Sequence, residues 1–309
     1  MAGGVIMLND AVESYLKVRH AAGFDLRHTG MLLRNFGQFC VARGETHVHG
    51  QTTIEWAAMA CSPGERSRRL KAVIRFAHYV RTEDDRHEIP PDRIFGYHKQ
   101  RHIPFIFSPT DIGKIINHAM RLSPVGSLRP YSYATLFGLL SATGLRVSEA
   151  LALRMDDITP DGLVVRKTKF RKSRLIPLHA TTLVALEHYL VRRKQVRESD
   201  DHLFVSLRGH GFRYETVRNV FHRLVHAAGI ECNPDRRKPG IHSLRHTFAV
   251  RALEACANDR DHIDQHILAL STYMGHAHVA DTYWYIEATP QLLGDIAKAL
   301  ENFLKGVPR

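Results

Sequence analysis

Residues 242–246, with the sequence His-Ser-Leu-Arg-His, bring together side chains suited to phosphate chemistry. His242 and Arg245 lie three residues apart, so on a helix they share one face. An imidazole beside a guanidinium fork can bind two oxygens of one phosphate group. A second arginine, Arg146, follows a glycine that ends an apolar run, and Glu149 stands three residues later, where it can orient Arg146 or a neighbouring histidine. These residues predict a site for a phosphate ester.

The order of the motifs resembles the tyrosine recombinase family, which includes phage integrases and Xer-type recombinases. The resemblance covers about residues 105–290 and rests on four family motifs. These are Ala-Thr-Gly-x-Arg-x-Ser-Glu at 142–149, Arg-x-Ile-Pro-Leu at 174–178, His-x-Leu-Arg-His at 242–246, and Met-Gly-His at 274–276, where the family commonly has Leu-Gly-His. The resemblance implies six catalytic residues: Arg146, Lys169, His242, Arg245, His276 and Tyr285.

Two of these six assignments depend on counting along the chain. Tyr285 lies nine residues after His276, the spacing of the family's nucleophile, and Tyr283 is the alternative. Counting back from residues 174–178 to the hairpin turn selects Lys169. Other cations surround it, and any of them could simply contact phosphate: Lys167, Arg171, Lys172 and Arg174.

The chemistry that the resemblance implies is transesterification of a DNA phosphodiester. Tyr285 would attack phosphorus, forming a 3′-phosphotyrosyl bond and releasing a 5′-hydroxyl. The two arginines would hold the non-bridging oxygens, His242 would accept the phenolic proton, and Lys169 would protonate the leaving oxygen. No metal or cofactor is needed. The family further implies a homotetramer on two double-stranded DNA sites, a Holliday junction, and accessory recombination proteins as further candidate partners.

Three alternatives from other classes fit the sequence less well. A type IB topoisomerase shares the chemistry, but the short chain and the Xer-like motifs disfavour it. A DNA-binding protein without catalysis is disfavoured by the complete set of residues. A metal enzyme is suggested by histidine pairs at 242/246 and 262/266, but neither pair has the glutamate of a zinc protease or an evident third ligand.

Charge and composition favour a nucleic-acid partner. The 309 residues include 43 Lys and Arg against 31 Asp and Glu, a net charge of +12, which favours a polyanionic partner. No apolar window is long enough to span a membrane, and Met1–Leu8 is too short for a signal peptide. Four scattered cysteines indicate a reducing compartment. The sequence thus predicts a cytoplasmic protein that binds DNA and no membrane.

The elements that position these residues are predicted to be mainly α-helical, with one small β-hairpin. By the resemblance, they form a two-domain DNA clamp of the tyrosine recombinase type. Residues 1–98 would form a helical core-binding, SAM-like domain, 99–106 a linker, and 107–309 a mixed α/β catalytic domain with a tail helix. Helices are expected at about 109–120, 130–143, 147–154, 180–197, 214–228, 242–256, 263–274 and 279–286, and the hairpin at 162–178.

The N-terminal domain is predicted to contain three helices. One begins near Asp10, which has capping-box spacing to Glu13; a second begins at Thr29 and stops before Gly44. The third, at about 64–81, carries a basic face opposite its apolar one: Arg66, Arg68, Arg69, Lys71 and Arg75. This face lacks compensating acids, so it is expected to contact phosphates. The alternative is a solvated surface.

Overall fold

The computed structural model describes residues 8–96, 104–166, 173–196, 200–230, 238–256, 263–276 and 278–287. The chain divides into two compact units, residues 1–101 and 102–309. The described residues are mainly helical with one three-stranded sheet, which confirms the predicted fold class. The predicted tail helix and most of the predicted linker lie outside the described residues. No helix within these ranges is long and apolar enough to cross a membrane.

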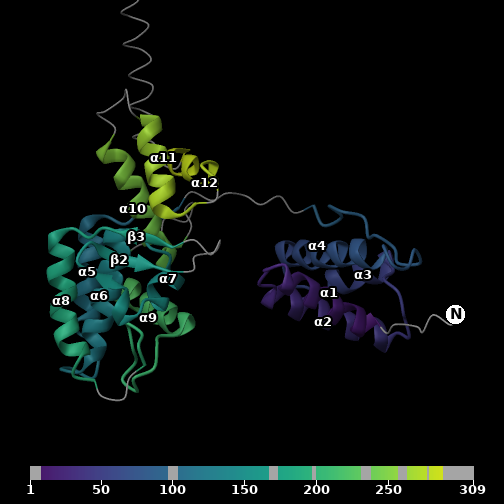
Figure 1. Ribbon diagram of the computed structural model, residues 1–309, viewed down its shortest axis with the longest axis horizontal. Coiled ribbons are helices and arrows are strands. Elements are labelled where there is room, and N and C mark those ends of the chain that lie inside the picture. The colour runs from purple at the N-terminus through teal and green to yellow at the C-terminus, as the bar shows by residue number, and fades with distance from the viewer. Residues whose placement is uncertain are drawn as a thin grey trace, which may run out of the picture. The chain divides into compact units, whose positions relative to one another are not determined.

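Four helices pack together in the described part of the first unit (Figure 1), and their core is aromatic. They are α1 (Leu8–Ala21), α2 (Arg27–Ala42), α3 (Gly50–Ala58) and α4 (Pro63–Val80). Phe36, Trp56 and Phe76 are almost fully buried between them. The α4 helix starts where the sequence supplies a cap, because the Ser62 hydroxyl accepts a hydrogen bond from the Glu65 N–H and Pro63 occupies the first turn.

Two features of this unit differ from the sequence-based expectation. Asp10 does not begin α1, which already includes Leu8, and Glu13 instead accepts two hydrogen bonds from Arg34, at 2.6 and 3.0 Å. The short α3 helix was not predicted. Its nine residues include Thr and Ile, which are weak helix formers, and no side chain caps its start. Packing of Trp56 against Phe36 stabilises it instead.

The second unit combines helices with a small sheet (Figure 1). Its elements are α5 (Pro109–Ala119), α6 (Leu128–Thr143), α7 (Val147–Ala152), β1 (Ile158–Thr159), β2 (Gly162–Val165), β3 (Arg174–Ile176), α8 (Ala180–Arg193), α9 (Tyr214–Ala227), α10 (Ile241–Ala255), α11 (Ile263–Met274) and α12 (Ala280–Glu287). The α6 helix contacts both α5 and α8. The strands form an antiparallel sheet in the order β1-β2-β3, with Leu163 opposite Ile176.

Gly144 lies between α6 and the predicted site residue Arg146. It ends α6 in the left-handed conformation, with φ of 60°, which glycine adopts without strain. A Cβ at this position would lie 2.4 Å from Cδ1 of Phe248 on α10. Only glycine therefore allows the end of α6, with Arg146 two residues after Gly144, to lie this close to the helix that carries Arg245.

Candidate active site

Four of the predicted catalytic residues lie in one cluster. Arg146 precedes α7, Arg245 lies on α10, His276 follows α11 and Tyr285 lies on α12. The Arg245 Nη2 atom is 3.1 Å from the His276 Nε2 atom, and the Tyr285 ring is stacked on the His276 ring at 6.0 Å. Arg146 reaches the same place by donating from Nη2 to the carbonyl oxygen of Gly275, at 2.8 Å. Residues up to 139 positions apart in sequence therefore share one site.

Arg245 is the most buried of the four, at 2% exposure. Its guanidinium donates to the carbonyl oxygens of Gly144, at 2.6 Å, and Met274, at 2.7 Å. Burial, together with the positive charge of Arg146, lowers the pKa of Arg245 to about 10. The group still carries its charge at neutral pH. Arg245 thus links the ends of α6 and α11 while presenting a positive charge inside the site.

His276 is neutral and connects the cluster to α12. Burial and the positive charge of Arg245 lower the pKa of His276 to about 4. Since arginine can only donate, the His276 Nε2 atom accepts from Arg245. The proton therefore lies on Nδ1, which donates to the hydroxyl of Thr282, at 2.8 Å, in the first turn of α12. This bond helps to orient the helix that carries Tyr285.

The low pKa of His276 predicts acid sensitivity of the fold. In the unfolded chain the imidazole binds a proton near its ordinary pKa of 6.5, but in the folded protein only near 4. Between these pH values the unfolded state holds more protons, so stability falls as the pH is lowered through this window. We expect the melting temperature of His276→Gln to fall less than that of the wild type when the pH is lowered from 7 to 4.5. Equal losses in the two proteins would contradict this origin of the acid sensitivity.

Tyr285 is 3% exposed, and its environment keeps the phenol protonated. Burial raises the pKa of Tyr285 above its ordinary value of 10, and the charge and hydrogen bond of Arg245 offset this only in part. His246 lies beside it, with ring centroids 5.5 Å apart, and His246 is also 4.6 Å from the ring of the exposed His242. Sequence reasoning gave His246 no role, although it ends the 242–246 motif. The alternative nucleophile, Tyr283, lies outside the residues whose side chains are described.

Glu149 orients Arg146, as its spacing predicted. Its carboxylate accepts from the Arg146 backbone N–H at 3.0 Å and from the Arg146 Nη1 atom at 2.9 Å. Arg174, which we expected among the phosphate contacts, donates to the same carboxylate at 2.8 and 3.1 Å, and its side chain is only 14% exposed. The other cations predicted around the hairpin turn lie outside the described residues: Lys167, Lys169, Arg171 and Lys172.

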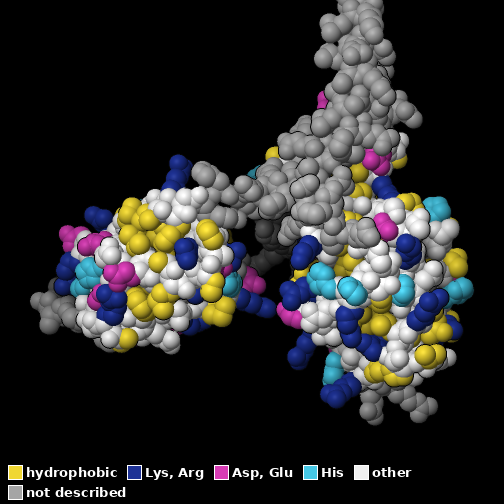
Figure 2. Space-filling model, turned by 180° about the vertical axis from the view of Figure 1, so that it is seen from behind, with side chains coloured by type: hydrophobic (Ala, Val, Ile, Leu, Met, Phe, Trp, Pro, Cys, Tyr) yellow, Lys and Arg dark blue, Asp and Glu magenta, His cyan; other side chains and the backbone are white. Residues whose placement is uncertain are grey.

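The predicted basic face of α4 divides into two groups. Arg66 and Arg69 are half-buried. Arg69 donates to the carbonyl oxygen of Trp56 in the last turn of α3, and Arg66 donates to that of Ala60, just after this helix. The remaining three cations of the face are exposed: Arg68, Lys71 and Arg75. Of these, Arg68 pairs with Glu65. In Figure 2, Lys and Arg side chains are visible on the surfaces of both units.

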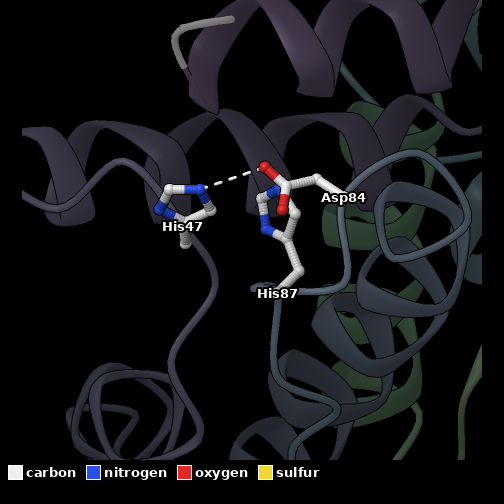
Figure 3. Close-up of side chains that lie close together, drawn as sticks. All are labelled: His47, Asp84 and His87. Carbon is white, nitrogen blue, oxygen red and sulfur yellow. Dashed lines mark hydrogen bonds and ion pairs between the residues drawn. The ribbon is translucent and has the colours of Figure 1, made fainter.

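One set of three side chains in the described ranges has the composition of a metal site: His47, Asp84 and His87, whose ligand atoms lie within 4.8 Å of one another (Figure 3). Hydrogen bonds already use these atoms. The His87 Nδ1 atom accepts from the Val48 N–H at 3.0 Å, so its proton lies on Nε2. Asp84 accepts from His47 at 3.2 Å and pairs with Arg86 at 2.7 Å. The cluster thus joins the segment before α3 to the segment after α4.

Comparisons with known proteins agree with the fold and show the family. Residues 107–291 match the model of the phage integrase family. The integrase/recombinase y4rB of Sinorhizobium fredii is 34% identical over 94% of this chain and 96% of its own length. The tyrosine recombinase XerD of Brucella abortus is 28% identical over 92% of this chain and 88% of its own. Among solved structures, XerH site-specific recombinase bound to palindromic difH substrate in a post-cleavage complex superposes with a TM-score of 0.63, 19% identity and coverage of 89% of this chain and 80% of that one. The chain belongs to the phage integrase family and is a tyrosine site-specific recombinase.

Proposed function

We propose that this recombinase cleaves and rejoins DNA through a 3′-phosphotyrosyl bond at Tyr285 and exchanges strands through a Holliday junction. The observation that carries the proposal is the cluster of Arg146, Arg245 and His276 beside the buried Tyr285. Two guanidinium groups beside one phenol suit a phosphodiester, because its non-bridging oxygens gain negative charge when phosphorus is attacked. Family membership supports the same chemistry.

In the proposed cleavage step, the phenolic oxygen of Tyr285 bonds to phosphorus and the bond to the 5′ oxygen breaks. Arg146 and Arg245 stabilise the charge on the non-bridging oxygens. Lys169 donates a proton to the departing 5′ oxygen as general acid. Rejoining is the reverse reaction, in which a 5′-hydroxyl attacks the phosphotyrosyl bond. The bond keeps the energy of the cleaved phosphodiester, so these side chains suffice for both steps.

The phenolic proton needs an acceptor, because the pKa of Tyr285 is raised. We assign this role to His242, the exposed histidine of the 242–246 motif. His246 lies against both rings, which supports a role in holding them in place. His276 is engaged with Arg245 and Thr282, so its contribution is to orient Arg245 rather than to take the proton.

The substrate is proposed to be double-stranded DNA, bound by four copies of the chain on two sites in the cytoplasm. Several solved structures of similar fold are complexes with DNA, among them those of XerH and of a transposon integrase. The net charge of +12 supports a polyanionic partner. Closure of residues 1–98 and 107–309 around DNA, with 99–106 as linker, belongs to the same proposal, as does help from accessory recombination proteins.

A recombination assay tests the proposed function against a topoisomerase. Purified protein is incubated with plasmids carrying candidate sites from the DNA that flanks its gene, and the products are sequenced. Recombinant junctions, with Holliday-junction intermediates on native gels, are the expected result. Relaxation of supercoiled plasmid without junctions would favour a type IB topoisomerase. Binding without any cleavage would favour a DNA-binding protein.

The exposed cations of α4 are expected to contribute to the salt dependence of DNA binding. Each phosphate that a cation neutralises adds about −0.9 to the slope of log affinity against log salt concentration. We therefore expect the triple variant Arg68→Ala, Lys71→Ala, Arg75→Ala to make this slope shallower by roughly two to three units. Fluorescence anisotropy at several salt concentrations measures the slope.

Arg66 and Arg69, the two half-buried arginines of α4, serve as the control. Arg66→Ala and Arg69→Ala remove donors to the backbone carbonyls of Ala60, just after α3, and of Trp56, in its last turn, so they are expected to lower the melting temperature of the protein. The exposed triple variant should melt close to the wild type. If the triple variant keeps the wild-type salt slope, these three cations do not contact DNA. The N-terminal unit would then bind DNA through another surface.

A further inference from the structure

Glu149 lies between two arginines, of which only one belongs to the family's catalytic set. Oε1 accepts from Nη1 of Arg146 at 2.9 Å and from Nη1 of Arg174 at 3.1 Å. Oε2 accepts from the Arg146 backbone N–H at 3.0 Å and from Nη2 of Arg174 at 2.8 Å. Both carboxylate oxygens are thus shared, and the two guanidinium groups are held by one anion.

The surroundings of Arg174 direct it into the site. It is the first residue of β3 and lies opposite Val165 on β2, but its side chain is only 14% exposed. A Cβ on Gly275 would lie 3.0 Å from Nη1 of Arg174 and 3.6 Å from Nη1 of Arg146. The two guanidinium groups therefore lie against the same glycine, in the 274–276 motif. A side chain held in this way does not extend to a DNA backbone outside the site.

The charges around Glu149 show what Arg174 contributes. Burial alone would raise the pKa of Glu149, but hydrogen bonds from Arg174 and from the Arg146 backbone lower it below its ordinary value, so the group is an anion. A buried carboxylate paired with Arg146 alone would cancel the charge of that arginine. With Arg174 present the three groups carry a net charge of +1, next to the further positive charge of Arg245.

We propose that Arg174 is a positioning residue that acts on Arg146 through Glu149. Arg174 holds the carboxylate at the place where it orients Arg146, and it offsets the charge of that carboxylate so that Arg146 stays effectively positive toward a phosphodiester. It also attaches β3 to the catalytic cluster, so the hairpin and Arg146 keep a fixed relation. This inference rests on the proposed function, because it assigns Arg174 a part in DNA cleavage and none in DNA binding.

Single-turnover cleavage of a nicked suicide DNA substrate tests the role. At saturating protein, Arg174→Gln is expected to slow formation of the covalent adduct about 100-fold, the effect of misplacing a catalytic group by about 1 Å. The dissociation constant for the same DNA should stay within about threefold of the wild-type value, because stabilisation that is lost only in the transition state does not weaken ground-state binding. Arg174→Lys, which keeps the charge but loses the bidentate contact, should recover part of the rate. It also carries the test if Arg174→Gln does not fold.

A double variant separates action through Glu149 from other roles. If Arg174 acts through Glu149, adding Arg174→Gln to Glu149→Gln should slow cleavage by no more than about threefold further. Lys194→Gln, an exposed charge change outside the cluster, should cleave at the wild-type rate. Wild-type cleavage by the Arg174 variants, multiplied losses in the double variant, or weaker binding with an unchanged saturating rate would each overturn the proposal. A wild-type protein that forms no adduct would instead reject the proposed function itself.

Discussion

Tyr285→Phe is expected to abolish the covalent protein–DNA adduct while DNA binding stays close to that of the wild type. The substitution removes one hydroxyl, and no other atom of the side chain can form the bond to phosphorus. The Tyr285 ring packs against His246 and His276, and phenylalanine keeps both contacts. The fold should therefore survive. A substrate nicked near the cleavage site traps the adduct, which is then seen as a shifted band on a denaturing gel.

Tyr283→Phe is the matched control, since it makes the same chemical change two residues away. It should form the adduct at a rate similar to the wild type. An adduct that persists in Tyr285→Phe and disappears in Tyr283→Phe would move the nucleophile to Tyr283. Mapping the modified peptide by mass spectrometry gives an independent reading of which tyrosine holds the DNA.

Local sequence signals predicted most of the helix boundaries well. The start of α5 is an example, because Ser108 and Asp111 form a capping box with hydrogen bonds of 2.9 and 3.0 Å, and Pro109 occupies the first turn. The end of α6 at Gly144 is another. These signals act within four residues of the chain, so the sequence alone contains them. The α3 helix has no such signal and is stabilised by contacts across the unit, which explains why it was missed.

The sequence predicted which residues form the candidate site but not which partners they contact. Motif order indicated Arg146, Arg245, His276 and Tyr285 without showing that Arg245 is held by two backbone carbonyls. Arg174 shows the same limit, since its partner Glu149 lies 25 residues earlier in the chain. A basic residue near a hairpin turn is equally suited to DNA or to a buried carboxylate, and only the contact between Arg174 on β3 and Glu149 on α7 decides. Arg66 and Arg69 were assigned to DNA for the same reason.

Arg245→Lys and Arg146→Lys are each expected to slow cleavage by about 100- to 1000-fold, or about 3 to 4 kcal/mol of transition-state stabilisation. Lysine keeps the positive charge but has one ammonium group in place of a planar fork. At position 245 it cannot reach the carbonyls of Gly144 and Met274 and also a phosphate oxygen. At position 146 it cannot donate hydrogen bonds to Glu149, to the Gly275 carbonyl and to the phosphate at the same time. Single-turnover rates on the suicide substrate measure both losses.

Arg251→Lys supplies the comparison that separates catalysis from folding. Arg251 lies on the same helix as Arg245 and also donates to a backbone carbonyl, that of Phe107 at 2.7 Å, but none of its described contacts is with the catalytic cluster. Its variant therefore reports what the loss of one guanidinium on α10 does to the fold. We expect near wild-type cleavage and binding for Arg251→Lys, whereas Arg146→Lys and Arg245→Lys should weaken binding far less than cleavage. Rates within tenfold of the wild type for both Arg146→Lys and Arg245→Lys would show that charge alone, without the bidentate geometry, supports the transition state.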